Sequence, residues 1–185
     1  MLESLINLDK KVFIFLNGLG SETFDPLWEI LTVQFYWAPF FAVILFLVYK
    51  KLGLKNFGIA ILFIAVLILI CDQSANFFKD NVQRLRPCND PEINGFIRIG
   101  EKKSGTFSFF SGHAANSIAT TTFVFLLLRR FYKHTYLLFL FPVIFAYSRI
   151  YLGLHFPLDI LAGYVYGGTF GYLFYRIFKK FILKA

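Results

Sequence analysis

The chain has 185 residues, of which 57% are hydrophobic and only 16% are charged, and its mean hydropathy is +0.62. This much apolar surface excludes an ordinary water-soluble domain of this length and indicates an integral membrane protein. The formal net charge of +8 lies largely between apolar runs. Membrane topology therefore explains the charge better than nucleic-acid binding, and no nucleic-acid partner is expected.

The apolar runs set the expected elements in chain order. Segment 2–19 has only a short apolar stretch, interrupted by Asp9, Lys10 and Lys11, and is predicted to form an interfacial or half-buried helix. Longer runs follow at 28–49, 57–78, 114–128, 136–154 and 158–178. Most of these approach the roughly 20 residues that a helix needs to cross the hydrocarbon layer. We predict an all-α bundle of five transmembrane helices that forms a single domain over residues 1–185, because unpaired peptide groups are costly in lipid.

Basic side chains mark one side of this predicted bundle. They cluster at 50–55, 129–133 and 176–184, which lie on the same side if the chain crosses the membrane five times. The positive-inside rule makes that side cytoplasmic. Residues 79–111 and 148–159 then face the periplasm or the exterior, and the loop 89–106 is a candidate substrate lid.

The first polar cluster is the segment from Lys79 to Pro87, at the end of the second long run. Pro87 prevents the helix from simply continuing, so Lys79, Arg84 and Arg86 are expected at the membrane surface. An Arg fork and a Lys ammonium both suit the oxygens of a phosphate dianion. The alternative is a basic collar that holds the helix end at the lipid headgroups, and this cluster alone favours that alternative.

The second polar cluster, Ser111, Gly112 and His113, opens the third long run. We predict that Ser111 or Ser108 caps this helix. The unpaired N–H groups of a helix start suit an anion, and Gly112 lets the anion approach closely. His113 is then placed to protonate a leaving oxygen. A Ser-Gly turn followed by an interfacial His is the competing interpretation.

The third polar cluster, Ser148, Arg149, His155 and Asp159, lies around the junction of the last two runs. The four-residue spacing of His155 and Asp159 places the carboxylate beside the imidazole if the junction is helical. The carboxylate then fixes the imidazole tautomer, and the free ring nitrogen can attack phosphorus. Pro157 argues against an undistorted helix through the whole junction. The competing interpretation is a structural His followed by a helix-capping Asp.

Together the three clusters read Lys-x6-Arg-Pro, Ser-Gly-His and Ser-Arg-x5-His-x3-Asp, in that order. The order and spacing resemble the type 2 phosphatidic acid phosphatase (PAP2) superfamily, with motifs from Lys79 to Asp159. The second motif of that family normally reads Pro-Ser-Gly-His, whereas Phe110 replaces the proline here. This change removes no catalytic group, so we expect activity to survive it.

The resemblance implies a bacterial inner-membrane lipid phosphatase whose active site faces the periplasm or the exterior. His155 would be the nucleophile that forms a phosphohistidine, Asp159 would orient it, and His113 would be the general acid and then the base. The groups that hold the phosphoryl oxygens would be Lys79, Arg86, Ser111, the Gly112 amide and Arg149. Several cations and helix N–H groups can together replace a metal ion, so no metal or other cofactor is expected.

The candidate substrates are undecaprenyl pyrophosphate, phosphatidylglycerophosphate, phosphatidic acid and a phosphate of lipid A, and the sequence does not separate them. The nearest alternative function is a phosphotransferase that passes the phosphoryl group from His155 to a second lipid. The other alternative is a non-catalytic phospholipid-binding membrane protein. Against it stand His113, His155 and Asp159, because binding needs neither a nucleophile nor an acid. The sequence makes no prediction of the oligomeric state.

Overall fold

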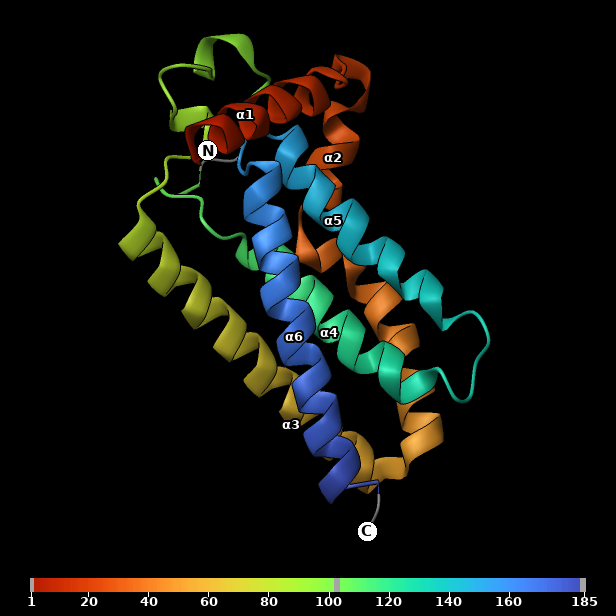
Figure 1. The fold of residues 1–185 in the computed structure, drawn as a ribbon. Helices are drawn as coiled ribbons and strands as arrows, with labels where there is room; N and C mark the ends of the chain where they lie inside the picture. Colours follow the sequence, from red (N-terminus) through yellow and green to blue (C-terminus); the bar gives the residue numbers. More distant parts are fainter. Residues whose placement is uncertain (1, 102–103, 184–185) are drawn as a thin grey trace.

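The computed structural model describes residues 2–101 and 104–183, which form helices and connecting turns without a β-strand. The helices are α1 (Leu2–Gly18), α2 (Asp25–Leu31), α3 (Ala38–Val82), α4 (Gly112–Leu128), α5 (Leu140–Tyr151) and α6 (Pro157–Phe181). In Figure 1, α3 to α6 form a bundle and α1 lies across one end of it. The all-α prediction is confirmed. Lys102 and Lys103 of the predicted lid and Lys184 of the last basic cluster lie outside the described residues.

α3 is a helical hairpin rather than a straight rod. Its backbone breaks at Gly53, where φ is +69° and ψ is 168°, and its two arms diverge from this turn in Figure 1. Among the described residues, only the stretch Gln34–Val82 is long and apolar enough to pass as a membrane span. As a straight rod it would be more than twice as long as the roughly 30 Å hydrocarbon layer. The break therefore gives two arms, which correspond to the predicted runs 28–49 and 57–78.

The first arm starts later than the sequence predicts, at Ala38 instead of residue 28. Residues Asp25–Leu31 form the separate helix α2, and Val33 after it is extended. The indole N–H of Trp37 donates to the carbonyl of Leu31 at 2.9 Å, which stabilises the turn between the two helices. The predicted run 136–154 is likewise shorter, since a 3-10 turn, Thr135–Phe139, precedes α5. The count of five membrane crossings stays a prediction.

α4 is the central helix, in contact with α3, α5 and α6, and most of its side chains are buried. Three glycines of α6, four residues apart, lie against carbonyl oxygens of α4: Gly163 against Ser111, Gly167 against Ala115 and Gly171 against Ala119. Small residues let two helix backbones approach closely in this way. The contact fixes the first turn of α4 beside the first turn of α6, where the polar clusters lie.

α1 buries one narrow stripe of side chains and leaves most of its remaining surface exposed. Asp9, Phe13 and Asn17, each four residues apart, are at most 4% exposed and face the protein. The apolar residues Phe15 and Leu19 are 66% and 62% exposed. The structure thus confirms a helix in this segment, while its interfacial or half-buried placement in a membrane stays a prediction.

Candidate active site

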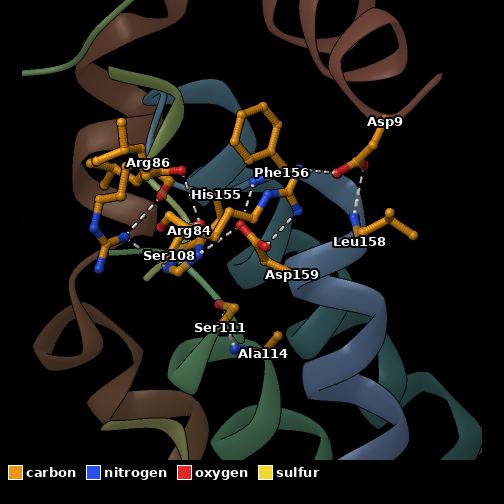
Figure 2. A network of polar contacts seen from close by, with 12 residues as sticks. Asp9, Arg84, Arg86, Ser108, Ser111, Ala114, His155, Phe156, Leu158 and Asp159 are labelled. Atoms are coloured by element: carbon orange, nitrogen blue, oxygen red, sulfur yellow. Dashed lines mark hydrogen bonds and ion pairs between the residues drawn. The ribbon is translucent and has the colours of Figure 1, made fainter. Parts of the chain in front are cut away.

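α3 ends at Gln83, which has left-handed dihedrals (φ 52°, ψ 30°) and whose N–H donates to the carbonyl of Lys79 at 3.0 Å. A left-handed residue at this position ends the helix and redirects the chain. Leu85 then forms an isolated antiparallel bridge with Phe107, and Arg86 is extended; Leu85 is 37% exposed, whereas Arg86 is buried. Figure 2 shows both arginines directed at the turn that carries His155.

The Arg86 guanidinium lies against His155. It donates from Nε to the carbonyl of Gly105 at 2.6 Å and from Nη1 to the carbonyl of Leu154 at 2.8 Å. Nη1 also lies 3.0 Å from Nε2 of His155. Because a guanidinium can only donate, Nε2 is the acceptor and the proton of the neutral ring is on Nδ1. The structure therefore points the unprotonated nitrogen at a cation.

The environment of His155 keeps the ring neutral. Burial lowers the pKa of the imidazole from 6.5 to about 4, assisted by the charge of Arg86 and opposed by Asp159. Nδ1 lies 3.5 Å from Oδ2 of Asp159 and makes no hydrogen bond. The two side chains are neighbours, as the four-residue spacing predicts, but at ion-pair distance.

The reason for this neighbourhood differs from the predicted one. α6 begins only at Pro157, so His155 lies in the turn before the helix rather than within it. Asp159 is the third residue of α6, and its Oδ2 accepts the N–H of Phe156 at 2.9 Å. The carboxylate thus caps α6 and faces the preceding turn. Helix capping, and not a continuous helix through the junction, brings Asp159 to His155.

The second cluster is joined to the third at the start of α4. Ser111 is the N-cap, because its Oγ accepts the N–H of Ala114 at 3.3 Å. Its own N–H donates to the backbone carbonyl of Asp159 at 3.0 Å. The ring of His113 stacks on Phe145 of α5, with centroids 5.2 Å apart. Ser108, the other candidate cap, instead donates to the carbonyl of Arg84.

Arg149 is buried in α5, with 6% of its surface exposed. Its Nη1 donates to Oγ1 of Thr32 at 2.7 Å, while its Nε has no partner. Its carbonyl accepts the N–H groups of Leu154 and His155 at 2.9 and 3.3 Å. Arg149 is therefore fixed beside the His155 turn with a buried donor that remains free to bind an anion.

Lys79 lies next to the second cluster. A Cβ built on Gly112 would be 3.9 Å from Nζ of Lys79 and 3.7 Å from Oδ1 of Asp72, so the ammonium and the carboxylate both lie beside the start of α4. Phe110, which replaces the proline of the family motif, is 3% exposed and packs on Phe78 and Tyr166. Phe110 thus contributes to the packing behind the site.

An apolar cavity of about 480 Å³ lies between the two arms of α3, α4 and α5. Its lining includes Asn116 and Ser117 of α4, one turn beyond His113, and Phe145, on which His113 stacks. Phe41 and Ile64 line it from the two arms of α3. The cavity therefore begins beside the second polar cluster and continues into the apolar part of the bundle.

The structure brings all three sequence clusters to one end of the bundle and adds contacts that the motifs did not indicate. Arg84 contacts Asp159, Asp9 of α1 contacts Arg84, and Thr32 contacts Arg149. The sequence did offer a signal for Asp9, because an acidic residue interrupts the otherwise apolar part of segment 2–19. Nothing in the sequence pattern distinguishes Thr32.

The donors at this site suit an anion. Arg86, Arg149 and Lys79 carry the positive charge around a neutral His155. Within residues 2–101 and 104–183, no three His, Cys, Asp or Glu side chains are grouped as ligands for a metal ion. The fold and the site together define a helical protein in which a histidine and several cations are gathered at one end of the bundle.

The chain belongs to the PAP2 superfamily, which matches residues 53–183. Two relatives are lipid A 4'-phosphatases. That of Bacteroides thetaiotaomicron is 34% identical over 183 residues, covering 97% of this chain and 81% of the relative. That of Porphyromonas gingivalis is 28% identical over 180 residues, covering 96% and 75%. An undecaprenyl-diphosphatase of Sulfolobus acidocaldarius is 28% identical over 178 residues, covering 95% and 81%.

A solved structure shows the same fold. The transmembrane PAP2-type phosphatidylglycerolphosphate phosphatase of Bacillus subtilis matches 98% of this chain and 87% of its own, with a TM-score of 0.67 at 19% identity. The family match and the shared fold identify the chain as a member of the PAP2 superfamily with the helical fold of this solved relative.

Proposed function

We propose that the chain is a lipid phosphatase that works through a phosphohistidine on Nε2 of His155. The observation that carries this proposal is the state of that ring. His155 is buried, its Nε2 is unprotonated and lies 3.0 Å from Arg86, and its Nδ1 faces Asp159. A neutral imidazole beside phosphate-binding cations is ready to attack phosphorus, whereas simple binding would need no nucleophile.

In the first step, Nε2 of His155 attacks phosphorus and the bond from phosphorus to the leaving oxygen breaks. His113 gives its proton to that oxygen, and Arg86 moves from Nε2 to a phosphoryl oxygen. The phosphohistidine ring is then cationic, and the Asp159 carboxylate, 3.5 Å from Nδ1, stabilises it. In the second step a water molecule loses a proton to His113 and attacks phosphorus, which releases inorganic phosphate and regenerates neutral His155.

The phosphoryl oxygens are held by Lys79, Arg86, Arg149, the Ser111 hydroxyl and the Gly112 amide. The free Nε donor of Arg149 supports this assignment, because a buried donor without an acceptor costs about 1–3 kcal/mol unless a ligand pairs with it. Phosphoryl transfer mainly requires positioning and charge neutralisation, which these groups supply. We therefore propose that the reaction needs no metal ion or cofactor.

Among the candidate substrates we favour a phosphate of lipid A, because two relatives that span nearly the whole chain carry that name. Undecaprenyl pyrophosphate is the second choice, since a third relative is named for it. The cavity of about 480 Å³ has room for an apolar chain of very roughly 15–20 carbons, by comparison with dry cavities that bind benzene. One lipid chain is thus held below His113 while the phosphate meets His155.

We place this single-domain protein in a bacterial inner membrane, with five crossings and the site on the periplasmic or outer side. The two arms of α3, together with α4, α5 and α6, supply the crossings. The basic segments 50–55 and 129–133 would then lie in the cytoplasm.

The proposal is tested by inorganic phosphate release from lipid A, undecaprenyl pyrophosphate, phosphatidylglycerophosphate and phosphatidic acid. Purified protein in detergent is assayed with a chelator present, beside His155→Ala. We expect release in the wild type and a loss of at least about 10³-fold in the variant, because the nucleophile is gone. Radiolabelled substrate should also leave an alkali-stable, acid-labile label on the wild type alone.

Other results would contradict the proposal. Release that stops with the chelator would contradict metal independence. A labelled lipid acceptor in place of free phosphate would identify a phosphotransferase. Tight lipid binding without turnover by the wild type would identify a binding protein.

A further inference from the structure

A chain of ion pairs leads from the His155 turn to the N-terminal helix (Figure 2). Arg84 donates from Nη1 to Oδ1 of Asp159 at 2.9 Å and from Nη2 to Oδ2 of Asp9 at 2.6 Å. The Asp9 and Asp159 side chains are 2% and 0% exposed, and that of Arg84 is 18% exposed. One guanidinium thus lies between two buried carboxylates that come from α1 and α6.

The members of this chain are themselves fixed. The Arg84 carbonyl accepts the N–H of Ser108 at 2.8 Å, and the guanidinium lies 4.0 Å from the ring centroid of Phe156. Oδ1 of Asp9 accepts the N–H of Leu158 at 2.9 Å. Asp9 therefore binds both Arg84 and the first turn of α6, so α1 is attached directly behind the His155 turn.

Arg84 sets the orientation of the Asp159 carboxylate. Oδ1 is held by Arg84 and Oδ2 by the N–H of Phe156, both at 2.9 Å, and Oδ2 is the oxygen that faces Nδ1 of His155. The terminal torsion of an aspartate has a broad energy profile. Without Arg84 the carboxylate would be fixed at one oxygen only, and its alignment with the imidazole would loosen.

Asp9 sets how much negative charge Asp159 offers to His155. In the trio, two carboxylates share one guanidinium, which leaves a net charge of one minus beside the imidazole. If Asp9 were neutral, the full charge of Arg84 would act on Asp159 and weaken its attraction for a cationic ring. If Arg84 were absent, two buried carboxylates would repel each other without compensation.

We propose that Arg84 and Asp9 are positioning residues of the phosphatase site, with Arg84 holding the Asp159 carboxylate towards His155 and Asp9 holding Arg84 from α1. This inference rests on the proposed function, since it assigns Asp159 the task of stabilising a cationic His155. Arg84 occupies a variable position of the first motif, and Asp9 lies outside all three motifs. Their effect should fall on the chemical step rather than on substrate binding, because neither holds the phosphate.

The test compares kcat and KM for phosphate release from lipid A, or from whichever lipid the wild type hydrolyses, in four variants: Asp9→Asn, Arg84→Gln, Arg84→Lys and the double variant Asp9→Asn/Arg84→Gln. We expect kcat to fall about tenfold in Asp9→Asn and about 100-fold in Arg84→Gln, with KM within about twofold. Arg84→Lys should recover part of the loss. The double variant should be no worse than Arg84→Gln, because Asp9 acts through Arg84.

Lys10→Gln is the matched control, since Lys10 also anchors α1, through Asp90 at 2.7 Å and Glu92 at 2.6 Å, without contacting Arg84 or Asp159. Its kcat should equal that of the wild type. Equal losses in Lys10→Gln and Asp9→Asn, or losses that appear only in KM, would overturn the inference. If Asp9→Asn and Arg84→Gln both kept the wild-type kcat while His155→Ala was inactive, this inference would be overturned and the proposed function would stand. A wild type without turnover would instead contradict the proposed function.

Discussion

His155, the proposed nucleophile, can attack phosphorus only while its ring is neutral, and its surroundings determine when that is so. Burial lowers the pKa of the imidazole from 6.5 to about 4, so the Nε2 lone pair is available above that pH and is lost as the pH falls through it. The unfolded chain, with an ordinary pKa near 6.5, binds this proton more tightly. The free energy of unfolding should therefore decrease as the pH falls from about 6.5 towards 4.

We expect His155 of the ligand-free protein to titrate with a midpoint near pH 4. The measurement is an NMR titration of histidine rings labelled at the ε carbon, with the His155 signal identified by its loss in His155→Gln. Titration of the ligand-free protein is preferable to measuring the rate against pH, because the substrate phosphate itself titrates near pH 6. A midpoint at 6.5 or above would show that the charged ring is stabilised, and it would contradict the neutral nucleophile.

At the scale of residues, sequence spacing could predict which groups lie together but not all of the contacts that hold them in place. His155 and Asp159 were predicted as neighbours from a helical spacing, and the structure makes them neighbours through helix capping instead. The contacts of Arg84 with Asp9 and of Arg149 with Thr32 join residues 75 and 117 positions apart. Such pairs depend on how helices pack, and no local pattern records them.

The packing of α6 on α4 places the second and third clusters side by side, and Gly167 tests this contact. A Cβ at Gly167 would collide with the carbonyl of Ala115. We expect Gly167→Ala to separate the helices and to lower the free energy of unfolding by about 1–3 kcal/mol. Thermal unfolding in detergent measures the change, and phosphate release should fall with it, because Ser111 and Asp159 are joined across the same contact.

Gly168→Ala is the matched control, because a Cβ at Gly168 meets nothing within 4 Å. Alanine there should be neutral or stabilising by up to about 1 kcal/mol, since it favours the helix. Equal destabilisation by the two substitutions would mean that loss of glycine itself, and not the contact with α4, is responsible.

At the scale of elements, apolar runs predicted the helices better than their ends. The runs 57–78 and 158–178 lie within α3 and α6, whereas the run from 28 includes α2 and a turn that hydrophobicity alone does not reveal. The predicted runs 28–49 and 57–78 leave a short connection between them. In the structure this connection is a helix break in which Gly53 alone has a positive φ. α1 was correctly expected to be a helix, and two of its polar residues, Asp9 and Asn17, are buried against the protein, where Asp9 binds Arg84.

At the scale of the whole molecule, the site and the basic segments lie at opposite ends. The turn of α3 near Lys55 lies at the end of the bundle away from α1, as does the connection from α4 to α5 (Figure 1). His155 and the end of α3 lie at the other end, beneath α1. The sequence could predict this separation, because the positive-inside rule depends only on where Lys and Arg lie between the apolar runs.

Cysteine labelling tests the resulting orientation. In a chain without Cys71 and Cys88, we expect a membrane-impermeant maleimide to label Asn94→Cys in spheroplasts, and Lys55→Cys only after permeabilisation; both native side chains are exposed. One arm of α3 separates the two positions, so opposite accessibility is required whichever way the protein is inserted. Labelling of both from outside would contradict a crossing by that arm. Labelling of Lys55→Cys alone would keep the crossing but place the phosphate site in the cytoplasm, where a lipid of the outer leaflet cannot reach His155.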